Sequence, residues 1–267
     1  MPAFDKITSV SNSMVKHAHA LTVPKKLKEE ADLLCEGFHL VAEAFRSDLR
    51  VRYVFATEKA LSGQEGASIA TQAQALKTRV FEVPDKIIGY LSETAAPQGI
   101  VAVVEKPVPK RPSVLRKCAL ALYEVQDPGN VGTLLRSAEA FGAEALFLTE
   151  GSCDPYNPKV VRASMGSLFR VPFESSVEPR ELMGWARGAG AVNAALTQGE
   201  GQDLTGIPLD RPVLFWAGAE GRGIPRVLAD ECELKVHIPM AGPVESLNVG
   251  VAASLALFYK GIGRPVP

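Results

Sequence analysis

The spacing of apolar and polar residues along this 267-residue chain predicts strands and helices in alternation. In the first part of the chain, apolar residues recur with a helical period over residues 9–21 and 31–45. Short apolar runs predict strands at residues 51–56, 79–83 and 99–104. This pattern fits a small α/β domain.

A second set of apolar runs begins at residue 118. Residues 118–125 are almost continuously apolar and too short for a surface helix, which predicts a strand buried on both faces. Further predicted strands lie at 145–148, 191–194, 213–217 and 233–238, and predicted helices at 131–141, 159–168, 180–187, 225–229 and 247–259. This regular alternation predicts a mostly parallel sheet covered by helices.

A proline-rich basic segment separates the two parts of the chain. Residues 105–113 contain three prolines and three basic side chains, which favour an extended and solvated backbone. We therefore predict a first domain over residues 1–105, a linker over 106–117 and a second domain over 118–267.

The net charge of the whole chain gives no indication of its partner, but the distribution of charge does. There are 29 basic and 30 acidic side chains, a formal charge of −1. Residues 1–117 carry 17 Lys and Arg against 13 Asp and Glu, or +4, while residues 118–267 carry 12 against 17, or −5. The modest basic excess makes the first domain the candidate for binding an anionic polymer.

Several classes of protein are disfavoured by the sequence. The four cysteines lie at least 35 positions apart and form no Cys-x-x-Cys pair, so we expect neither a metal site nor a disulfide framework. No apolar run reaches the roughly 18 residues of a membrane span, and the amino terminus lacks the apolar core of a signal peptide. We expect a cytoplasmic protein with no membrane partner.

Three segments of the second domain each join a predicted strand to a predicted helix through a polar loop. Such loops form the ligand sites of parallel sheets. The first, QDPGNVGTLLR, places Asn130 where an amide can cap the next helix and Arg136 inside that helix. The third, HIPMAGPVESLNVG, places Ser246 at a predicted cap and Asn248 in the first turn. Taken singly, each loop is also compatible with simple capping.

The second loop, FWAGAEGRGIP, has glycines in the order Gly-x-x-Gly-x-Gly. This order differs from the Gly-x-Gly-x-x-Gly of dinucleotide-binding folds, and no Gly-Lys-Ser/Thr follows it, so nicotinamide binding is poorly supported and a P-loop is excluded. The glycines indicate backbone that another group approaches closely. Glu220 is the single acidic side chain of this loop, and an exposed tight turn is the alternative interpretation.

The three loops in this order, together with NPKVVRASMG at residues 157–166, resemble the SpoU/TrmH family of SPOUT RNA ribose methyltransferases. The resemblance extends over residues 118–260. The segments ITSVSNSMVK at 7–16 and LCEGFHLVAEA at 34–44 look like the ribosomal-protein-like substrate-binding domain that many members of this family carry.

This resemblance implies an α/β fold with a SPOUT parallel sheet, a deep trefoil knot formed by the second and third loops, and a smaller amino-terminal α/β RNA-binding domain. It implies an enzyme that transfers a methyl group from S-adenosylmethionine to a ribose 2′-hydroxyl, with 23S rRNA as the preferred substrate, and that forms a homodimer through the knot region. The alternatives are a tRNA 2′-O-methyltransferase and a non-catalytic RNA-binding factor with the same fold.

The resemblance also assigns individual residues. The catalytic set carried over is Arg136, Asn130, Glu220, Ser246 and Asn248; the cofactor set is Ala217, Gly218, Ile238, Met240, Leu247 and Asn248; and Arg162 and Ser164 would bind the RNA backbone. A guanidinium is effectively always charged, which favours Arg136 as a phosphate clamp over Arg136 as a base. Gly250 departs from the family, where Ser is frequent. Lysines concentrated in the first 28 residues add Lys16, Lys25 and Lys26 as candidate phosphate contacts.

Overall fold

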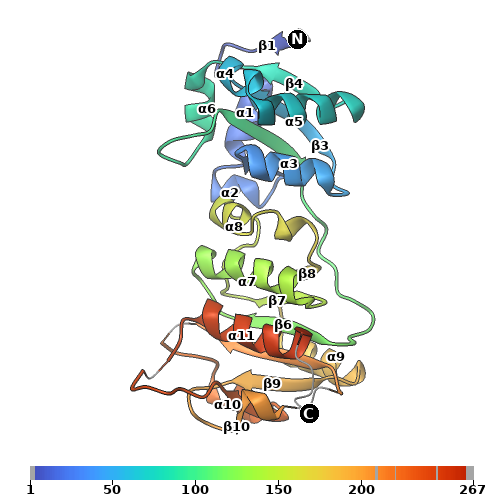
Figure 1. The fold of residues 1–267 in the computed structure, drawn as a ribbon, viewed down its shortest axis with the longest axis vertical. Coiled ribbons are helices and arrows are strands. Elements are labelled where there is room, and N and C mark those ends of the chain that lie inside the picture. The colour runs from blue at the N-terminus through green and yellow to red at the C-terminus, as the bar shows by residue number, and fades with distance from the viewer. Residues whose placement is uncertain (1–3, 208–209, 220, 245, 263–267) are drawn as a thin grey trace. The chain divides into compact units, whose positions relative to one another are not determined.

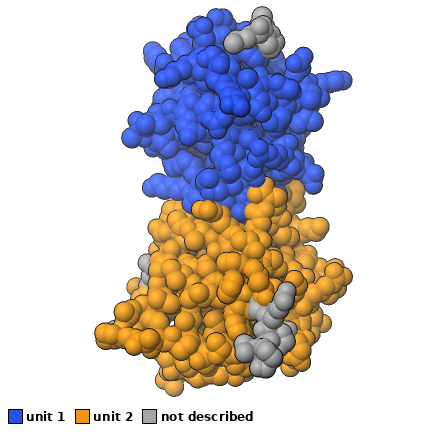
Figure 2. Space-filling model, in the orientation of Figure 1, with its two compact units in different colours: residues 1–107, 156–169 blue, residues 108–155, 170–267 orange. Residues whose placement is uncertain are grey.

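The computed structural model divides the chain into two compact units (Figure 2). The described residues are 4–207, 210–219, 221–244 and 246–262. Unit 1 contains residues 1–107 and 156–169, and unit 2 contains residues 108–155 and 170–267. These limits differ from the predicted ones in two respects: unit 2 begins at residue 108, within the predicted linker over 106–117, and the segment with the Arg-x-Ser-x-Gly motif folds as part of unit 1.

Unit 1, whose helices α1, α3 and α5 are labelled in Figure 1, is built on a five-stranded mixed sheet with the strand order β1-β4-β3-β5-β2. Its strands are β1 (Asp5–Lys6), β2 (Asp32–Glu36), β3 (Val51–Ala56), β4 (Arg79–Glu82) and β5 (Ile100–Glu105). Its helices are α1 (Ser13–Ala20), α2 (Pro24–Leu27), α3 (Phe38–Arg46), α4 (Glu58–Ser62), α5 (Gln64–Ala75), α6 (Asp85–Leu91), α8 (Pro158–Ala163) and the 3₁₀ turn η1 (Ser167–Phe169). The structure confirms the predicted small α/β fold.

The prediction of a single helix over residues 31–45 is wrong. Residues Asp32–Glu36 form strand β2, which pairs antiparallel with β5, and helix α3 begins only at Phe38. Gly37 separates the two elements with a φ of 91°, a left-handed conformation that favours glycine and interrupts a helix. The apolar run over residues 32–36 is not part of a helical face but a strand buried on both faces.

Unit 2 is a seven-stranded sheet with the order β10-β12-β9-β11-β6-β7-β8, and all neighbouring strands run parallel. The strands are β6 (Cys118–Tyr123), β7 (Leu146–Thr149), β8 (Phe173–Val177), β9 (Val192–Leu196), β10 (Gln202–Asp203), β11 (Val213–Gly218) and β12 (Leu234–His237). The helical elements are α7 (Pro128–Phe141), α9 (Pro179–Gly188), η2 (Leu204–Gly206), α10 (Arg226–Asp230) and α11 (Val249–Ile262). The predicted parallel α/β architecture is confirmed, whereas the trefoil knot stays a prediction.

The core of unit 2 explains why its central strands read as continuous apolar runs. Cys118 to Leu122 of β6 and Val213 to Ala217 of β11 are all buried, so both faces of these strands are covered. Helices α9 and α10 pack on the face that carries Trp216, while α11 contacts both α7 and the two central strands. The sequence pattern missed β8, because its Phe-Glu-Ser-Ser-Val is half polar.

Two kinds of feature are absent from the described residues. No helix in the described ranges combines the length and the apolar content needed to cross a bilayer. In the same ranges, no group of three or more His, Cys, Asp or Glu side chains is placed to hold a metal ion.

Candidate functional site

The first loop holds the Asn130 side chain away from the capping role predicted for it. Helix α7 begins at Pro128, three residues earlier than predicted, and Asp127 caps it by accepting a hydrogen bond from the backbone N–H of Asn130 (2.8 Å). An Asp immediately before a Pro at the first helical position is a sequence signature of a helix start. That signature marks Asp127, which is not among the candidate residues predicted from the sequence.

The third loop places Asn248, and not Ser246, at the start of the last helix. Asn248 Oδ1 accepts hydrogen bonds from the backbone N–H groups of Gly250 (2.8 Å) and Val251 (3.3 Å), and α11 begins at Val249. The prediction that Ser246 caps this helix is therefore wrong. Ser246 lies exposed in the loop, two residues before the cap.

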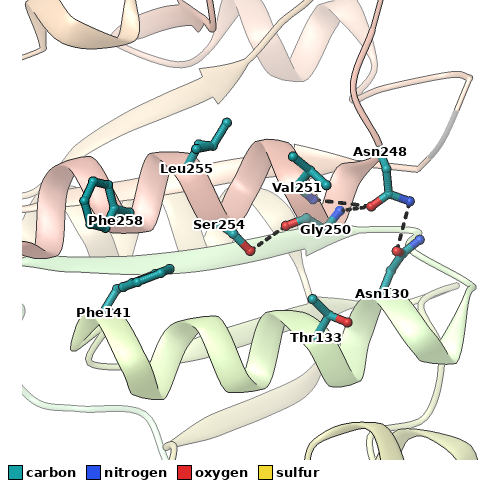
Figure 3. A pocket seen from close by; sticks show the side chains of 9 residues that line it. All are labelled: Asn130, Thr133, Phe141, Asn248, Gly250, Val251, Ser254, Leu255 and Phe258. Atoms are coloured by element: carbon teal, nitrogen blue, oxygen red, sulfur yellow. Dashed lines mark hydrogen bonds between the residues drawn. The ribbon is translucent and has the colours of Figure 1, made fainter.

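The two asparagines connect the first and third loops directly (Figure 3). Asn248 Nδ2 donates to Asn130 Oδ1 at 3.1 Å. The orientation of the Asn248 amide follows from its cap, since backbone N–H groups require its oxygen and leave its nitrogen turned to Asn130. Two residues 118 positions apart are thus joined by hydrogen bonds that run from the first turn of α11 through Asn248 to Asn130.

Gly250 leaves the room that this asparagine pair occupies. A Cβ atom at position 250 would lie 2.9 Å from Asn248 Oδ1 and 3.2 Å from Asn130 Oδ1. Contacts this short force the neighbouring atoms to move, and Asn248 Oδ1 is already held by two backbone N–H groups. Glycine at this position is therefore matched to the observed pairing of Asn130 and Asn248.

A cavity of about 630 Å³ lies between α7 and α11, and the asparagine pair forms its polar end. Toward the other end the lining is apolar, where the rings of Phe141 and Phe258 meet edge to face at a centroid distance of 5.4 Å. The lining residues are Asn130, Thr133, Phe141, Asn248, Gly250, Val251, Ser254, Leu255 and Phe258. Of the predicted site residues that the structure describes, only Asn130 and Asn248 line this cavity.

The second loop folds back on itself at the carboxyl end of β11. Ala219 and Gly223 form a bridge, with the Gly223 N–H donating to the Ala219 carbonyl at 2.8 Å, and the Ala219 N–H donates to the Tyr123 carbonyl at 3.1 Å. A Cβ atom on Gly218 would lie 2.0 Å from the carbonyl carbon of Gly223. Only glycine permits this turn. Glu220, the predicted acidic member of the catalytic set, lies outside the described residues.

The residues predicted to hold S-adenosylmethionine fit an adenosine ligand in their chemistry. Ala217 and Gly218 end β11, while Ile238 follows β12 directly, and parallel strands place both ends at the same edge of the sheet. Ile238 and Leu247 are partly exposed and Met240 is exposed, so apolar side chains border this edge. Adenine is bound by apolar walls together with backbone hydrogen-bonding groups.

Two polar side chains close to these loops, Tyr123 and Arg136, differ in charge. Desolvation, reinforced by the negative charge of Glu124, raises the pKa of the Tyr123 phenol, which therefore stays neutral at physiological pH. Arg136 lies exposed on α7, and among the residues that the structure describes it has no hydrogen-bond or ion-pair partner. Its five N–H donors are thus available to an external anion.

The predicted RNA contacts fall in unit 1, and they differ in accessibility. Arg162 lies on α8, with its guanidinium 3.2 Å from a carboxylate oxygen of Glu93 and 3.7 Å from one of Glu36. Ser164 is fully buried and its hydroxyl donates to the Val161 carbonyl at 2.8 Å, an arrangement that closes the turn after α8 and leaves no surface for RNA. The lysines of the candidate phosphate contacts are all exposed, namely Lys16 on α1 and Lys25 and Lys26 on α2.

Comparison with known proteins identifies the family that this fold and these loops define. Residues 117–258 match the model of the SpoU rRNA Methylase family, and residues 34–109 match a family described as RNA 2′-O ribose methyltransferase substrate binding. The chain therefore belongs to the SpoU rRNA methylase family. The resemblance found in the sequence is confirmed, including that of the amino-terminal part.

Individual relatives match over nearly the whole chain. The 23S rRNA (guanosine(2553)-2′-O)-methyltransferase RlmP of Bacillus subtilis is 31% identical over 95% of this chain and 98% of its own. The 23S rRNA (uridine(2479)-2′-O)-methyltransferase of Streptomyces viridochromogenes is 34% identical over 70% of this chain and 68% of its own. The crystal structure of an AdoMet-bound rRNA methyltransferase from Sinorhizobium meliloti superposes with a TM-score of 0.82 at 30% identity, covering 96% of both chains.

Proposed function

We propose that this protein transfers a methyl group from S-adenosylmethionine to a ribose 2′-hydroxyl of 23S rRNA. The observation that carries the proposal is the hydrogen bond between Asn130 and Asn248, which joins the first and third loops at a polar site beside the helix of Arg136. Relatives named as 23S rRNA 2′-O-methyltransferases that match most of this chain give the substrate class.

S-adenosylmethionine, when bound, would supply an electrophilic methyl group on its sulfonium sulfur; the products of the transfer are the 2′-O-methylated ribose, S-adenosylhomocysteine and a proton released to solvent. The protein's own contribution is to bind and orient. Gly218 keeps the backbone of the second loop close enough for the adenosine to be held by main-chain groups, with Ile238 and Leu247 as apolar neighbours.

Arg136 holds the RNA in this proposal. An exposed guanidinium without a partner in the described ranges can form two parallel hydrogen bonds to a phosphate, which fixes both the position and the direction of the adjoining ribose. Asn130 lies six residues, or about 1.7 turns, before Arg136 on α7. It accepts a hydrogen bond from Asn248 and shapes the polar wall of the site. Ser246 and Glu220 belong to the same proposed catalytic set.

The proposed assembly is a homodimer, with the last helix at the interface. Val251, Leu255, Phe258 and Ile262 are each 40–52% exposed and recur at the spacing of one face of α11. Together with the cavity between α7 and α11 they leave a continuous apolar surface, which monomeric proteins rarely expose. A second copy of the chain, related by a two-fold axis, would cover this surface with the same residues.

In this proposal, RNA binding and methyl transfer belong to different parts of the chain. Residues 1–105 bind RNA, residues 106–117 link the domains, and residues 118–267 bind the cofactor and carry the reaction. The segment 156–169, which folds in unit 1, extends the RNA-binding part. The four cysteines are free thiols, which suits the reducing cytoplasm where we place the reaction.

A transfer assay tests the function. The purified protein is incubated with methyl-labelled S-adenosylmethionine and with unmodified 23S rRNA, 16S rRNA or tRNA, and label in each RNA is counted. We expect label in 23S rRNA. Label in tRNA alone would replace the proposed substrate by the tRNA alternative, and RNA binding without label in any RNA would favour a non-catalytic binding factor.

A further inference from the structure

A stacked pair of aromatic rings lies on the surface of unit 1. The imidazole of His19 on α1 and the ring of Tyr90 on α6 have centroids 4.0 Å apart and planes inclined by 21°. Tyr90 is 41% exposed, and His19 is partly exposed. No other stacked pair of rings occurs in the described parts of the chain, where the remaining ring pairs are tilted or edge to face.

The end of helix α6 fixes the orientation of the pair. The last carbonyl groups of a helix lack partners within the helix, and the Tyr90 carbonyl is one of these. His19 Nδ1 lies 3.1 Å from the Tyr90 carbonyl oxygen, and since a carbonyl only accepts, Nδ1 carries the proton. The histidine is therefore tied to the backbone of the residue whose ring it stacks on, which holds the two rings in register.

Exposed lysines flank the rings on both helices. Lys86 precedes Tyr90 by four residues on α6 and Lys16 precedes His19 by three on α1, so each lysine shares a helix face with its ring. Both lysines are exposed. A rigid aromatic surface bordered by cations is the arrangement by which proteins hold single-stranded nucleic acid, with a base on the ring and phosphates on the lysines.

We propose that the His19–Tyr90 stack is a docking platform for one unpaired base of the RNA substrate, with Lys16 and Lys86 contacting the phosphates beside that base. This inference rests on the proposed function, since it names residues that would recognise the RNA. It adds an aromatic element to an RNA-binding surface for which the sequence predicts only phosphate or backbone contacts.

The test compares variants that separate the aromatic face from the hydrogen bond. Tyr90→Leu removes the ring and Tyr90→Phe keeps it; His19→Gln keeps a donor for the Tyr90 carbonyl but removes the second ring, and His19→Phe does the reverse. Leu76→Ser, at an exposed position outside both helices, is the matched surface control. Full-length protein and in vitro transcribed 23S rRNA are used, and filter binding gives the dissociation constant over a range of salt concentrations.

We expect Tyr90→Leu and His19→Gln to weaken RNA binding by about 10-fold, in line with the loss of one base–aromatic stack. Tyr90→Phe, His19→Phe and Leu76→Ser should stay within about 2-fold of the wild type. Lys86→Gln should lower the slope of log affinity against log salt by about 0.7, the share of one phosphate contact on single strands, whereas Tyr90→Leu should leave that slope unchanged. Affinity for S-adenosylmethionine and the melting temperature should not move.

Wild-type RNA affinity in Tyr90→Leu would overturn the platform. So would an equal loss in Tyr90→Phe, or in Tyr90→Leu a fall in melting temperature that accounts for the weaker binding. If the wild-type protein binds and methylates 23S rRNA while Tyr90→Leu does so equally well, the proposed function stands and the platform alone fails. If the wild-type protein neither binds nor methylates the RNA, both fail.

Discussion

Replacing Asn248 tests whether the hydrogen bond to Asn130 matters for the reaction separately from the start of α11. In Asn248→Ala the helix loses a cap that accepts two backbone N–H groups, a loss of about 1 kcal/mol. The hydrogen bond from Asn248 Nδ2 to Asn130 Oδ1 is also lost, which at a solvent-accessible site removes about 1 kcal/mol more. For a unit of this size, a total of about 2 kcal/mol lowers the melting temperature by about 4–8 °C.

Asn248→Ser is the matched control for the cap. A serine hydroxyl caps a helix about as well as an asparagine oxygen, but it is too short to reach Asn130. We expect Asn248→Ser to melt within about 3 °C of the wild type and yet to lose methyl transfer by about 5-fold, because one hydrogen bond of about 1 kcal/mol no longer holds Asn130 in the transition state. Calorimetry and labelled-methyl transfer under saturating RNA measure the two effects. Near wild-type transfer in Asn248→Ser would refute the role given to the asparagine pair.

Four further predictions concern the other parts of the site. Gly250→Ala should impair methyl transfer with little loss of RNA affinity, since its Cβ would crowd both asparagine oxygens; unaltered turnover would contradict the close fit. Gly218→Ala should abolish S-adenosylmethionine binding in calorimetry, because the new methyl group would lie 2.0 Å from the Gly223 backbone, and a measurable wild-type affinity would show that the loop has another conformation. Arg136→Lys should reduce turnover by at least about 10-fold with cofactor affinity intact, while near-normal turnover would exclude a need for the planar guanidinium. Phe258→Glu should sediment as an inactive monomer, and an active monomer would remove the proposed dimer.

The four strands β6, β7, β9 and β11 of unit 2 could be predicted from the sequence because they are buried at nearly every position and so contain almost no polar residues. Strand β3 was predicted at its observed limits, Val51–Ala56, for the same reason. The single helix predicted over residues 31–45 is wrong because an apolar strand followed by an amphipathic helix has the same pattern of apolar residues as one long helix. The left-handed Gly37 separates the two elements. The half-polar β8 offered no comparable signal.

For the site, the loops could be predicted but their local hydrogen bonds could not. The resemblance to the family identifies Asn130 and Asn248. Which of several neighbouring polar side chains accepts hydrogen bonds from the first N–H groups of each helix cannot be predicted from the sequence. Asp127 takes that role in the first loop and Asn248 in the third, which leaves the Asn248 amide nitrogen for Asn130. The burial of Ser164 results from packing within unit 1, and the local sequence motif does not predict it.

The position of the transferred methyl group tests the central proposal most directly. Unmodified 23S rRNA is incubated with S-adenosylmethionine and either the wild-type protein or Arg136→Ala, digested to nucleosides and analysed by mass spectrometry. We predict a single 2′-O-methylated nucleoside with the wild-type protein and none with Arg136→Ala. A methyl group on a base, or equal 2′-O-methylation by the two proteins, would contradict the account.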